Sequence, residues 1–478
     1  MTQLVWFRTD LRVRDNTALA AACAAGPVLA LYLITPEQWQ EHDDSPAKVD
    51  FWRRNLKVLA ETLHTLNIPL LIRQVARWAD AAAIVAKLSQ QHGIQTVHAN
   101  AEYGVNEQRR DEAVKAALNR NRIGFQRHLD QLFFEPGSVL TKSGGYFKVF
   151  GQFRKTCINL LQHSLPPLIP PPRIQTVRSI ESDPVPNQIP SYAAVSSVIQ
   201  QQWPAGENEA HARLRRFVDE RMEVYHDDRD FPSRPGTSEL SAYLAAGVLS
   251  PRQCLHAVLS ANRGELTTGA PGASTWIDEL LWREFYKHIL VGYPHVSMSR
   301  AFHRHTEALP WRRDTDDLDA WKYGKTGIPI IDAAMRQMRE TGWMHNRLRM
   351  ITAMFLSKNL LIDWREGERW FMQNLIDGDL AANNGGWQWS ASTGTDSVPY
   401  FRIFNTYSQS ERFDPNGRFI RTWVPELASL DDKAIHNPFK RWQRAIKDYP
   451  APIVEVKESR ERALMAFRNL PKPAKRQA

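Results

Sequence analysis

The sequence predicts two folded parts, an α/β domain built on a parallel sheet and a larger all-helical domain that follows it. Short apolar runs alternate with helical stretches in the first part of the chain. Beyond residue 206 the apolar spacing is helical and few alternating strand patterns intervene. A chain of 478 residues is long enough for two or three domains of about 150 residues each. We therefore predict domains at 1–130 and 206–470, joined by a connection at 131–205.

The α/β part is predicted from four buried strands. The apolar runs at 4–7, 28–34, 69–75 and 96–100 have the length and composition of strands. Helical stretches at 16–25, 50–66 and 79–93 separate them. Such alternation favours βαβ units, and so a Rossmann-like parallel sheet with helices on both faces. The glycine motif GxGxxG does not follow the first strand, so the usual dinucleotide site is not predicted there.

The connection is marked by proline. Eight prolines lie between Pro166 and Pro190, and chain of this composition is extended and semi-rigid. The helical part then begins, and its final residues, 471–478, form a predicted disordered basic tail. Helical periodicity is found at 211–222, 240–247, 250–261, 274–290, 329–342, 345–361 and 366–378.

Composition limits the class of protein. No apolar run reaches the roughly 18–20 residues that a membrane span needs, and the N-terminus lacks the apolar core of a secretory signal. Cys23, Cys157 and Cys254 are far apart and form no CxxC or zinc spacing, so we expect no metal and a cytoplasmic location. The net charge is +9, which fits a merely basic protein and a nucleic-acid-binding one about equally well.

Tryptophan gathers in the second half. Of 16 tryptophans, 11 lie after residue 270, interleaved with Arg, Asn and His. Indoles mostly serve as core, but this mixture also suits a pocket that stacks flat rings. In the helix predicted at 274–288, one face collects two indoles, a carboxylate, a guanidinium and a phenol. That face is a pocket wall or the charged rim of an amphipathic helix; its members are Trp276, Glu279, Trp282, Arg283 and Tyr286.

A second site is indicated at 237–247. Thr237 and Ser238 have the residue types of a helix start, and Gly247 has the type of a helix end. Hydroxyls and free backbone N–H groups at such a start can bind an anion, although simple capping is the commoner role. This segment alone does not decide between the two.

Five stretches of the chain resemble the photolyase/cryptochrome family. The resemblance is carried by 7–19, 282–286, 342–350, 363–371 and 377–405, and runs essentially end to end. It is greatest to bacterial enzymes that split cyclobutane pyrimidine dimers in DNA. It implies a domain that holds an antenna pigment, a helical domain that binds FAD, and light-driven electron transfer from reduced anionic FAD to a flipped-out dimer. The alternative is a cryptochrome-type photoreceptor without repair activity.

The resemblance also implies which residues meet FAD. Trp387, Trp364 and Trp311 match the electron-transfer chain, Trp387 being nearest the flavin, and Asn383 matches the residue that faces flavin N5. With Glu279 these are the expected catalytic residues. The expected FAD contacts are Tyr225, Thr237, Ser238, Glu239, Leu240, Ser241, Trp276, Arg283, Asn346, Arg349, Asp377, Asp379 and Asn383.

The partner implied is ultraviolet-damaged DNA, double- or single-stranded, bound by a monomer. Trp282 and Trp389 match an aromatic wedge around the dimer, and Glu279 matches a contact to the thymine edge. Cryptochromes typically carry Asp or Cys where this chain has Asn383, and enzymes for the (6-4) lesion place two His where Asn346 and Met350 stand. The remaining expected DNA contacts are Arg229, Arg283, Tyr286, Arg347 and Arg402.

The segment 101–111 resembles the binding segment for an antenna, 5,10-methenyltetrahydrofolate. His42, Asn106 and Glu107 are the contacts that this resemblance implies. Met298 stands near a position where folate-type enzymes commonly have Lys.

Overall fold

The computed structural model describes residues 1–177, 179–442 and 446–471. It contains two compact units, unit 1 with residues 1–223, 238–294 and 376–379, and unit 2 with residues 224–237, 295–375 and 380–478. The domain boundaries at 130 and 205 stay a prediction. Of the predicted tail at 471–478, residues 472–478 lie outside the described part of the chain.

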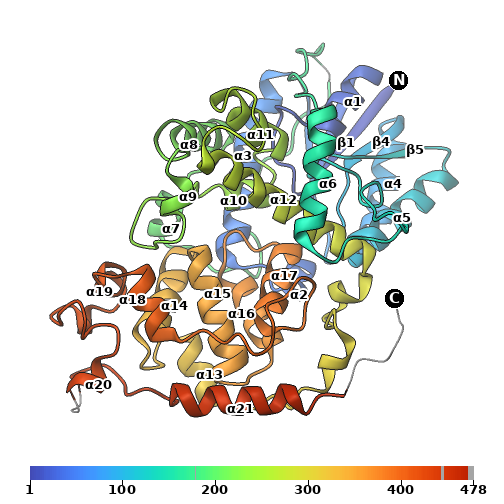
Figure 1. Ribbon diagram of the computed structural model, residues 1–478. Coiled ribbons are helices and arrows are strands. Elements are labelled where there is room, and N and C mark those ends of the chain that lie inside the picture. Colours follow the sequence, from blue (N-terminus) through green and yellow to red (C-terminus); the bar gives the residue numbers. More distant parts are fainter. Residues whose placement is uncertain (178, 443–445, 472–478) are drawn as a thin grey trace. The chain divides into compact units, whose positions relative to one another are not determined.

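Unit 1 is built on a five-stranded parallel sheet (Figure 1). The strand order is β3-β2-β1-β4-β5, so the chain runs outward from the central strand first to one edge and then to the other. In the middle of the sheet Val5 pairs with Ala30 on one side and with His98 on the other. The predicted Rossmann-like sheet is confirmed. Its strands are β1 (Thr2–Phe7), β2 (Val28–Ile34), β3 (Leu70–Gln74), β4 (Ile94–Asn100) and β5 (Gly124–His128).

Helices cover both faces of this sheet. The helix α1 packs on β1 and β4, α3 on β3, α4 on β4 and α5 on β5. Asn16 starts α1 by accepting a hydrogen bond from the N–H of Leu19 at 3.0 Å, as its residue type favours. The helices of this layer are α1 (Thr17–Ala25), α2 (Pro36–Glu41), α3 (Pro46–Thr65), α4 (Ala81–Gln91) and α5 (Val105–Arg120).

Three elements of this layer were not predicted: the short helix α2, the strand β5 and the helix α5. The strand β5 has the sequence GFQRH, and it is an edge strand whose residues are exposed or half-buried. An edge strand of this kind needs no apolar run, so periodicity cannot identify it. The helix α5 buries only four side chains, two of them charged, and its polar sequence conceals its apolar face.

The proline-rich connection runs beside strand β3. The N–H of Gln175 donates to the carbonyl of Leu66, and that of Asp183 donates to the carbonyl of Leu70. Because the connection pairs with backbone groups shortly before this edge strand and at its first residue, part of the sheet edge is covered. The other helices of unit 1 are α6 (Phe150–His163), α7 (Ser197–Gln202), α8 (Glu207–Glu220), α10 (Ser241–Ala245), α11 (Pro251–Ala261) and α12 (Pro271–Gly292).

A buried ionic network joins the sheet layer to α11 inside unit 1. Arg12 pairs with Asp130 at 2.7 Å, and Arg252 on α11 pairs with Asp130 and with Asp15, each at 3.0 Å. All four side chains are nearly inaccessible to solvent. Buried charges persist only when they are paired in this way, so the network fixes where α11 lies against the sheet layer.

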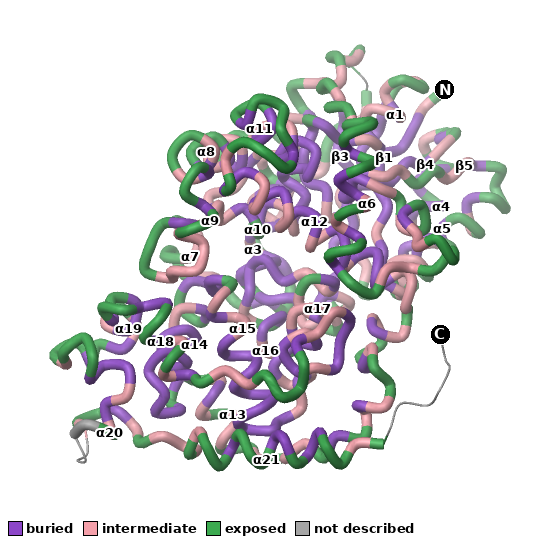
Figure 2. Tube along the Cα trace, in the orientation of Figure 1, coloured by how far each residue is buried: buried purple, intermediate pink, exposed green. Residues whose placement is uncertain are grey.

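Unit 2 is helical, and its core gathers the apolar faces of α14 to α19 (Figure 2). Its helices are α9 (Tyr225–Asp228), α13 (Thr315–Lys322), α14 (Pro329–Thr341), α15 (Asn346–Met354), α16 (Trp364–Asn374), α17 (Leu380–Ala391), α18 (Thr406–Phe413), α19 (Arg418–Trp423), α20 (Pro438–Trp442) and α21 (Val456–Arg468). Short 3-10 turns stand at Arg304–Ala308 and Pro425–Leu427 in unit 2, at Trp78–Asp80 in unit 1, and at Pro294–Met298, where the sequence passes from unit 1 to unit 2. The predicted all-helical part is confirmed.

Three predicted helix bounds were wrong. The helix predicted at 366–378 ends at Asn374. Thr237 and Ser238 do not start a helix, because Glu239 has a left-handed φ of +52° and α10 begins only at Ser241. The helix predicted at 345–361 ends at Met354 and continues as a π-helical turn, Phe355–Asn359. Among the described helices, none is long and apolar enough to span a bilayer.

Candidate functional site

In unit 1, helix α12 carries most of the residues predicted to line a pocket. Trp276 is buried against Phe217, with ring centroids 5.0 Å apart. Trp282 is half-buried and stacks on Phe150 at 3.7 Å, and Tyr286 lies 5.6 Å from it. Parallel stacking fixes the plane of the Trp282 indole. The helix therefore presents an oriented aromatic surface rather than a loose one.

The polar residues of α12 are held by partners in unit 1. Arg283 donates from Nη1 to the backbone carbonyl of Gln131. Lys287, one turn further along, donates to Asp379 at 2.8 Å. Lys287 was not predicted as a site residue, because its partner lies 92 residues away in the sequence. The pair holds the carboxylate of Asp379, an expected FAD contact, in one orientation.

In unit 2, helix α15 carries Asn346 to Met350 and is started by a histidine. The Nδ1 atom of His345 accepts a hydrogen bond from the N–H of Arg347 at 3.2 Å. Burial lowers the pKa of His345 to about 4, so the ring is neutral and can accept this bond. Arg349 donates from Nε to the carbonyl of Met344 at 2.8 Å. The side chain of Asn346 is exposed, and that of Met350 is half-buried.

Arg347, an expected DNA contact, is compensated by a carboxylate. Its Nη2 lies 2.7 Å from Oδ1 of Asp230, and its guanidinium lies 4.5 Å from the Phe413 ring centroid. Sequence reasoning missed Asp230. Arg229 lies over the ring of Tyr225, with its guanidinium carbon 5.5 Å from the ring centroid. Arg402 is exposed.

Two of the three expected electron-transfer tryptophans are buried in the core of unit 2. Trp364 is the first residue of α16, which Asp363 starts by accepting from the N–H of Arg365 at 3.1 Å. Trp387 on α17 lies edge-on to Phe371 at 4.9 Å. Both indoles belong to one hydrophobic cluster, and Trp311 is half-buried and packs against it. The three indoles therefore lie in or against one cluster, with one of them near solvent, and their order as an electron path stays a prediction.

Trp387 needs a glycine beside it. A Cβ atom at Gly367 would lie 2.1 Å from Cη2 of the indole, so no other residue fits there without moving the ring. Trp321 is also edge-on to Trp387, at 5.9 Å. The indole nitrogen of Trp387 accordingly has a fixed position, and it has no hydrogen-bond partner among the described residues.

Asn383 is oriented by the helix next to it. Its Nδ2 donates to the backbone carbonyl of Glu368 at 2.9 Å. Only the amide nitrogen can donate, so the side-chain oxygen faces away from Glu368 as an acceptor. Asn384 donates to the Glu368 carboxyl at 2.8 Å and accepts from Gln388 at 2.8 Å. The stretch that includes both asparagines is helical, and this amide network ties α17 to α16.

Glu368 is the member of this network that sequence reasoning missed. Burial raises the pKa of its carboxyl to about 7, and the hydrogen bond from Asn384 acts in the opposite direction. A carboxyl of this kind changes protonation near neutral pH, beside the backbone that orients Asn383.

The expected antenna residues come together in unit 1. Asn106 donates to Nε2 of His42 at 3.1 Å, and the His42 ring lies edge-on to Trp78 at 4.7 Å. Glu107 is in the first turn of α5, and burial and the neighbouring Glu102 raise its pKa. His42, which follows α2, therefore lies beside the first turn of α5, where the other two expected antenna residues stand.

The other expected residues are placed as follows. Tyr225 is buried and Thr237 half-buried in unit 2, while Glu239 pairs with Arg213 at 3.3 Å in unit 1. Trp389, on α17, is half-buried. The remaining ones lie in unit 1, where Leu240 and Asp377 are buried, Ser238 and Glu279 are half-buried, and Ser241 is exposed. Among the described residues, no three His, Cys, Asp or Glu side chains are placed to hold a metal ion.

Two family models match the chain. The model described as "DNA photolyase" matches residues 3–172, and the one described as "FAD binding domain of DNA photolyase" matches residues 276–469. The FAD-binding function of the helical part is therefore supported by a model of its own.

Full-length relatives give the same result. The chain is 46% identical to a deoxyribodipyrimidine photo-lyase of Salmonella typhimurium and 47% identical to that of Escherichia coli, in each case over 98% of both proteins. Among solved structures it is similar to a class III photolyase from Agrobacterium tumefaciens (TM-score 0.88, 35% identity, 98% and 97% of the two chains). It is also similar to a Synechocystis cryptochrome (TM-score 0.84, 28% identity, 97% and 99%). Together these matches show that the chain belongs to the DNA photolyase family.

Proposed function

We propose that this protein is a deoxyribodipyrimidine photo-lyase, an enzyme that uses light and FAD to split cyclobutane pyrimidine dimers in damaged DNA. The observation that carries the proposal is the identity of 46–47% to enzymes of that name over almost the whole chain. The arrangement of Asn383, the tryptophans and α12 supports it, because each has a chemical role in such a reaction.

The residues present fit a bound flavin. When bound, reduced FAD supplies the electron that light transfers to the dimer. The Oδ1 of Asn383, which is not the atom that bonds to Glu368, is an acceptor suited to the N–H that a reduced flavin carries at N5. The ion pair with Lys287 orients the carboxylate of Asp379, which can accept a hydrogen bond from a donor at the flavin ring edge. The other contacts we propose are those the family resemblance implies, among them Tyr225, Asn346 and Asp377.

The tryptophans are proposed to return electrons to an oxidised flavin. Trp387 and Trp364 are shielded from water, which suits transient oxidation of an indole, and Trp311 has access to solvent and a reductant. Phe371 and Gly367 hold the Trp387 indole in place. This order of tryptophans is part of the proposal.

Damaged DNA is proposed to bind with its dimer flipped out of the duplex. A damaged pair stacks poorly, so flipping costs less there than at normal bases. The stacked indole of Trp282 offers a flat, preset surface for the extruded bases, with Trp389 as its counterpart. Glu279 would accept from a thymine N–H. Arg402, exposed and without an ion pair among the described residues, is suited to a phosphate.

A folate antenna is proposed at His42, Asn106 and Glu107, where the carboxyl and amide groups can pair with the edge of a pterin. A solved structure of a Sulfolobus tokodaii photolyase contains two FAD molecules, which makes a flavin the alternative antenna. We also propose that the enzyme acts as a monomer in the cytoplasm.

The test is a repair assay. The purified protein with reduced FAD is mixed with ultraviolet-irradiated oligonucleotide, under blue light and in darkness, and dimers are counted. Loss of dimers under light alone is the expected result. Equal dimer content in both arms, with normal photoreduction of the flavin, would favour the cryptochrome function that the Synechocystis structure keeps open.

A second measurement tests the tryptophan row. Trp387→Phe should slow photoreduction of oxidised FAD by at least about a hundredfold, while repair by chemically reduced enzyme stays near normal. Trp423→Phe is the matched control, because this indole is half-buried in the same unit and packs on Phe419. Normal photoreduction in Trp387→Phe would refute the assignment.

A further inference from the structure

Trp282, the indole proposed to meet the flipped-out bases, is supported by a second ring. Phe150 is the first residue of α6, and its ring centroid lies 3.7 Å from that of Trp282, with the two planes 12° from parallel. The helices α6 and α12 lie side by side in unit 1 (Figure 1). Phe150 is 8% exposed, whereas Trp282 is half-buried, so the supporting ring is covered and part of the indole stays accessible.

Phe150 also lies on the buried face of α6, edge-on to Phe285 at 5.9 Å, so it contributes to the core as well. Other contacts join the same two helices. Phe153 packs on Phe285 at 5.4 Å, and Arg154 pairs with Asp278 at 2.5 Å. Because these contacts do not involve Phe150, loss of its ring should leave α6 in place on α12.

The chain that leads to Phe150 is anchored at the end of α12. Tyr146 packs on Gly292, where an added Cβ would collide with the tyrosine ring. The carbonyl of Tyr146 also accepts a hydrogen bond from the hydroxyl of Tyr293 at 3.4 Å. Phe150 therefore stands between this anchor and the start of α6, which leaves its ring little freedom to turn away from Trp282.

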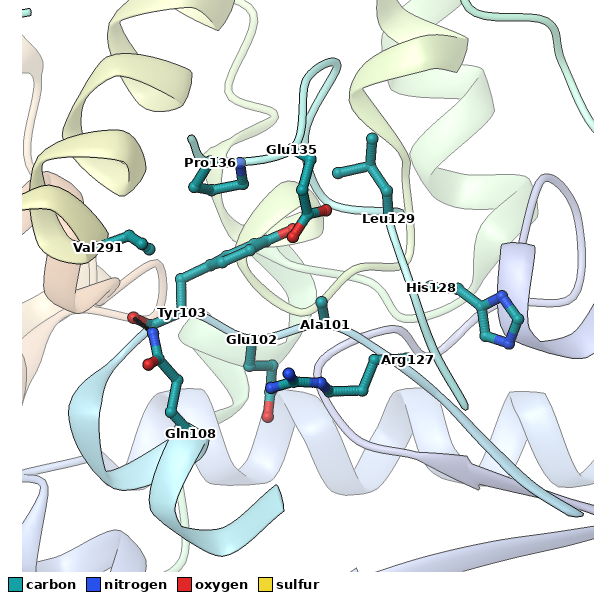
Figure 3. Close-up of a pocket in the computed structure, with 10 residues that line it drawn as sticks. All are labelled: Ala101, Glu102, Tyr103, Gln108, Arg127, His128, Leu129, Glu135, Pro136 and Val291. Carbon is teal, nitrogen blue, oxygen red and sulfur yellow. Dashed lines mark hydrogen bonds between the residues drawn. The ribbon is translucent and has the colours of Figure 1, made fainter. Parts of the chain in front are cut away.

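The last turn of α12 also borders a pocket of about 450 Å³, through Val291 (Figure 3). The pocket lies beside the segment 101–111, which is expected to bind an antenna, and its lining there is Ala101, Glu102, Tyr103 and Gln108. Within the described part of the chain, its lining includes neither Phe150 nor Trp282, and Trp282 stands about 13 Å of helix before Val291. The stacked pair is therefore a separate feature of α12.

We propose that Phe150 is a positioning residue for recognition of the dimer and that it acts through Trp282. The inference rests on the proposed function, in which Trp282 meets the extruded bases. An indole plane that is set in advance lowers the ordering cost when flat bases stack on it. Binding of undamaged DNA depends mainly on phosphate contacts, which do not involve this ring. Phe150 therefore contributes to the preference for damaged DNA rather than to DNA affinity as a whole.

A double-mutant cycle in the full-length, FAD-containing protein tests the inference. Affinities for an oligonucleotide with one thymine dimer and for the same sequence undamaged are measured by fluorescence anisotropy, in darkness and at one salt concentration. Phe150→Leu should weaken binding of the dimer oligonucleotide about threefold to tenfold and leave that of the undamaged one within about twofold. In a Trp282→Ala background the same substitution should change dimer affinity by less than about twofold, because the ring through which Phe150 acts is gone.

Phe147→Leu is the matched control. Phe147 stands in the loop before α6 and is half-buried, but its ring lies edge-on to Phe153 at 6.1 Å. This variant should keep the wild-type affinity for both oligonucleotides. Phe150→Met, which also replaces the ring by a flexible apolar chain, takes the place of Phe150→Leu if that variant does not retain FAD.

Fluorine NMR of protein labelled with fluorotryptophan reports on the stack directly. The line that is missing from Trp282→Phe belongs to Trp282. That line should shift in Phe150→Leu, because the ring current of the neighbouring phenyl group is lost, and it should stay in place in Phe147→Leu.

Three results would overturn the inference alone. The first is an unchanged preference for the dimer oligonucleotide in Phe150→Leu. The second is an additive loss in the double variant, which would mean that Phe150 acts without Trp282, and the third is an unshifted Trp282 line in Phe150→Leu. A wild-type protein that binds both oligonucleotides equally would instead refute the proposed function, and with it the inference.

Discussion

The buried carboxyl of Glu368 leads us to predict that the free energy of unfolding depends on pH. Its side chain is buried, and burial raises its pKa from 4.5 to about 7. A shift of this size corresponds to roughly 3 kcal/mol between the protonated and ionised forms. Because the folded protein keeps the proton more tightly than the unfolded chain, ionisation destabilises the fold. The cost is absent below pH 4.5, grows as pH rises toward 7, and is fully present above the folded pKa.

Glu368→Gln removes this ionisation and keeps the acceptor oxygen for Asn384. The variant should match the wild type in free energy of unfolding near pH 4.5 and exceed it by up to about 3 kcal/mol at pH 8. Urea titrations across this range measure the difference. Infrared spectra give a direct second readout, in which a protonated carboxyl band present at pH 6 and missing from the variant belongs to Glu368.

The control is Glu366→Gln on the same helix, where the side chain is 41% exposed. Its stability difference from the wild type should be small and should not grow with pH. If the Glu368→Gln and wild-type stabilities run parallel from pH 4.5 to 8, the buried carboxyl does not titrate near neutrality and the reasoning fails.

Three further outcomes are expected. Lys287→Met removes the largely buried ion pair with Asp379 at 2.8 Å, so the melting temperature should fall by an amount equivalent to roughly 3 kcal/mol, and adding Asp379→Asn should restore part of it. In Gly247→Ala the new Cβ would lie 2.0 Å from a backbone oxygen, whereas in Gly93→Ala, where φ is also near +60°, the space around the Cβ is open. Gly247→Ala should therefore lower the free energy of unfolding by far more than the about 1–2 kcal/mol expected for Gly93→Ala, and chemical denaturation compares the two variants. Arg402→Ala should lower the salt dependence of affinity for irradiated DNA by about one ion, measured by fluorescence anisotropy at several salt concentrations; an unchanged slope would exclude a phosphate contact.

The parts of the fold that could be predicted are those that bury apolar side chains at a regular spacing. The strand β2 is buried along its whole length, and its sequence VLALYLI shows this directly. The start of α10 could not be predicted, because the left-handed backbone at Glu239 is a conformation that its residue type does not announce. The edge strand β5 was missed because no burial pattern marks it.

In the candidate site, too, some contacts could be predicted from the sequence and others could not. Local capping by Asp363 follows from neighbouring residues and could be anticipated. The pairing of Arg347 with Asp230 joins residues 117 apart, and nothing in local spacing reveals such a partner. Motif likeness assigns a role to Arg347, but only three-dimensional structure shows which charge already compensates it.

That compensation changes how the net charge of +9 bears on DNA binding. A phosphate that contacts Arg347 must compete with the carboxylate of Asp230 at 2.7 Å, so forming the contact gains less free energy than the charge alone implies. Arg402 has no such competitor among the described residues and is exposed. A phosphate there displaces only water and counterions, which is the source of salt-dependent affinity. Of these two arginines, Arg402 should therefore dominate the salt dependence, and Arg347 should act mainly in positioning.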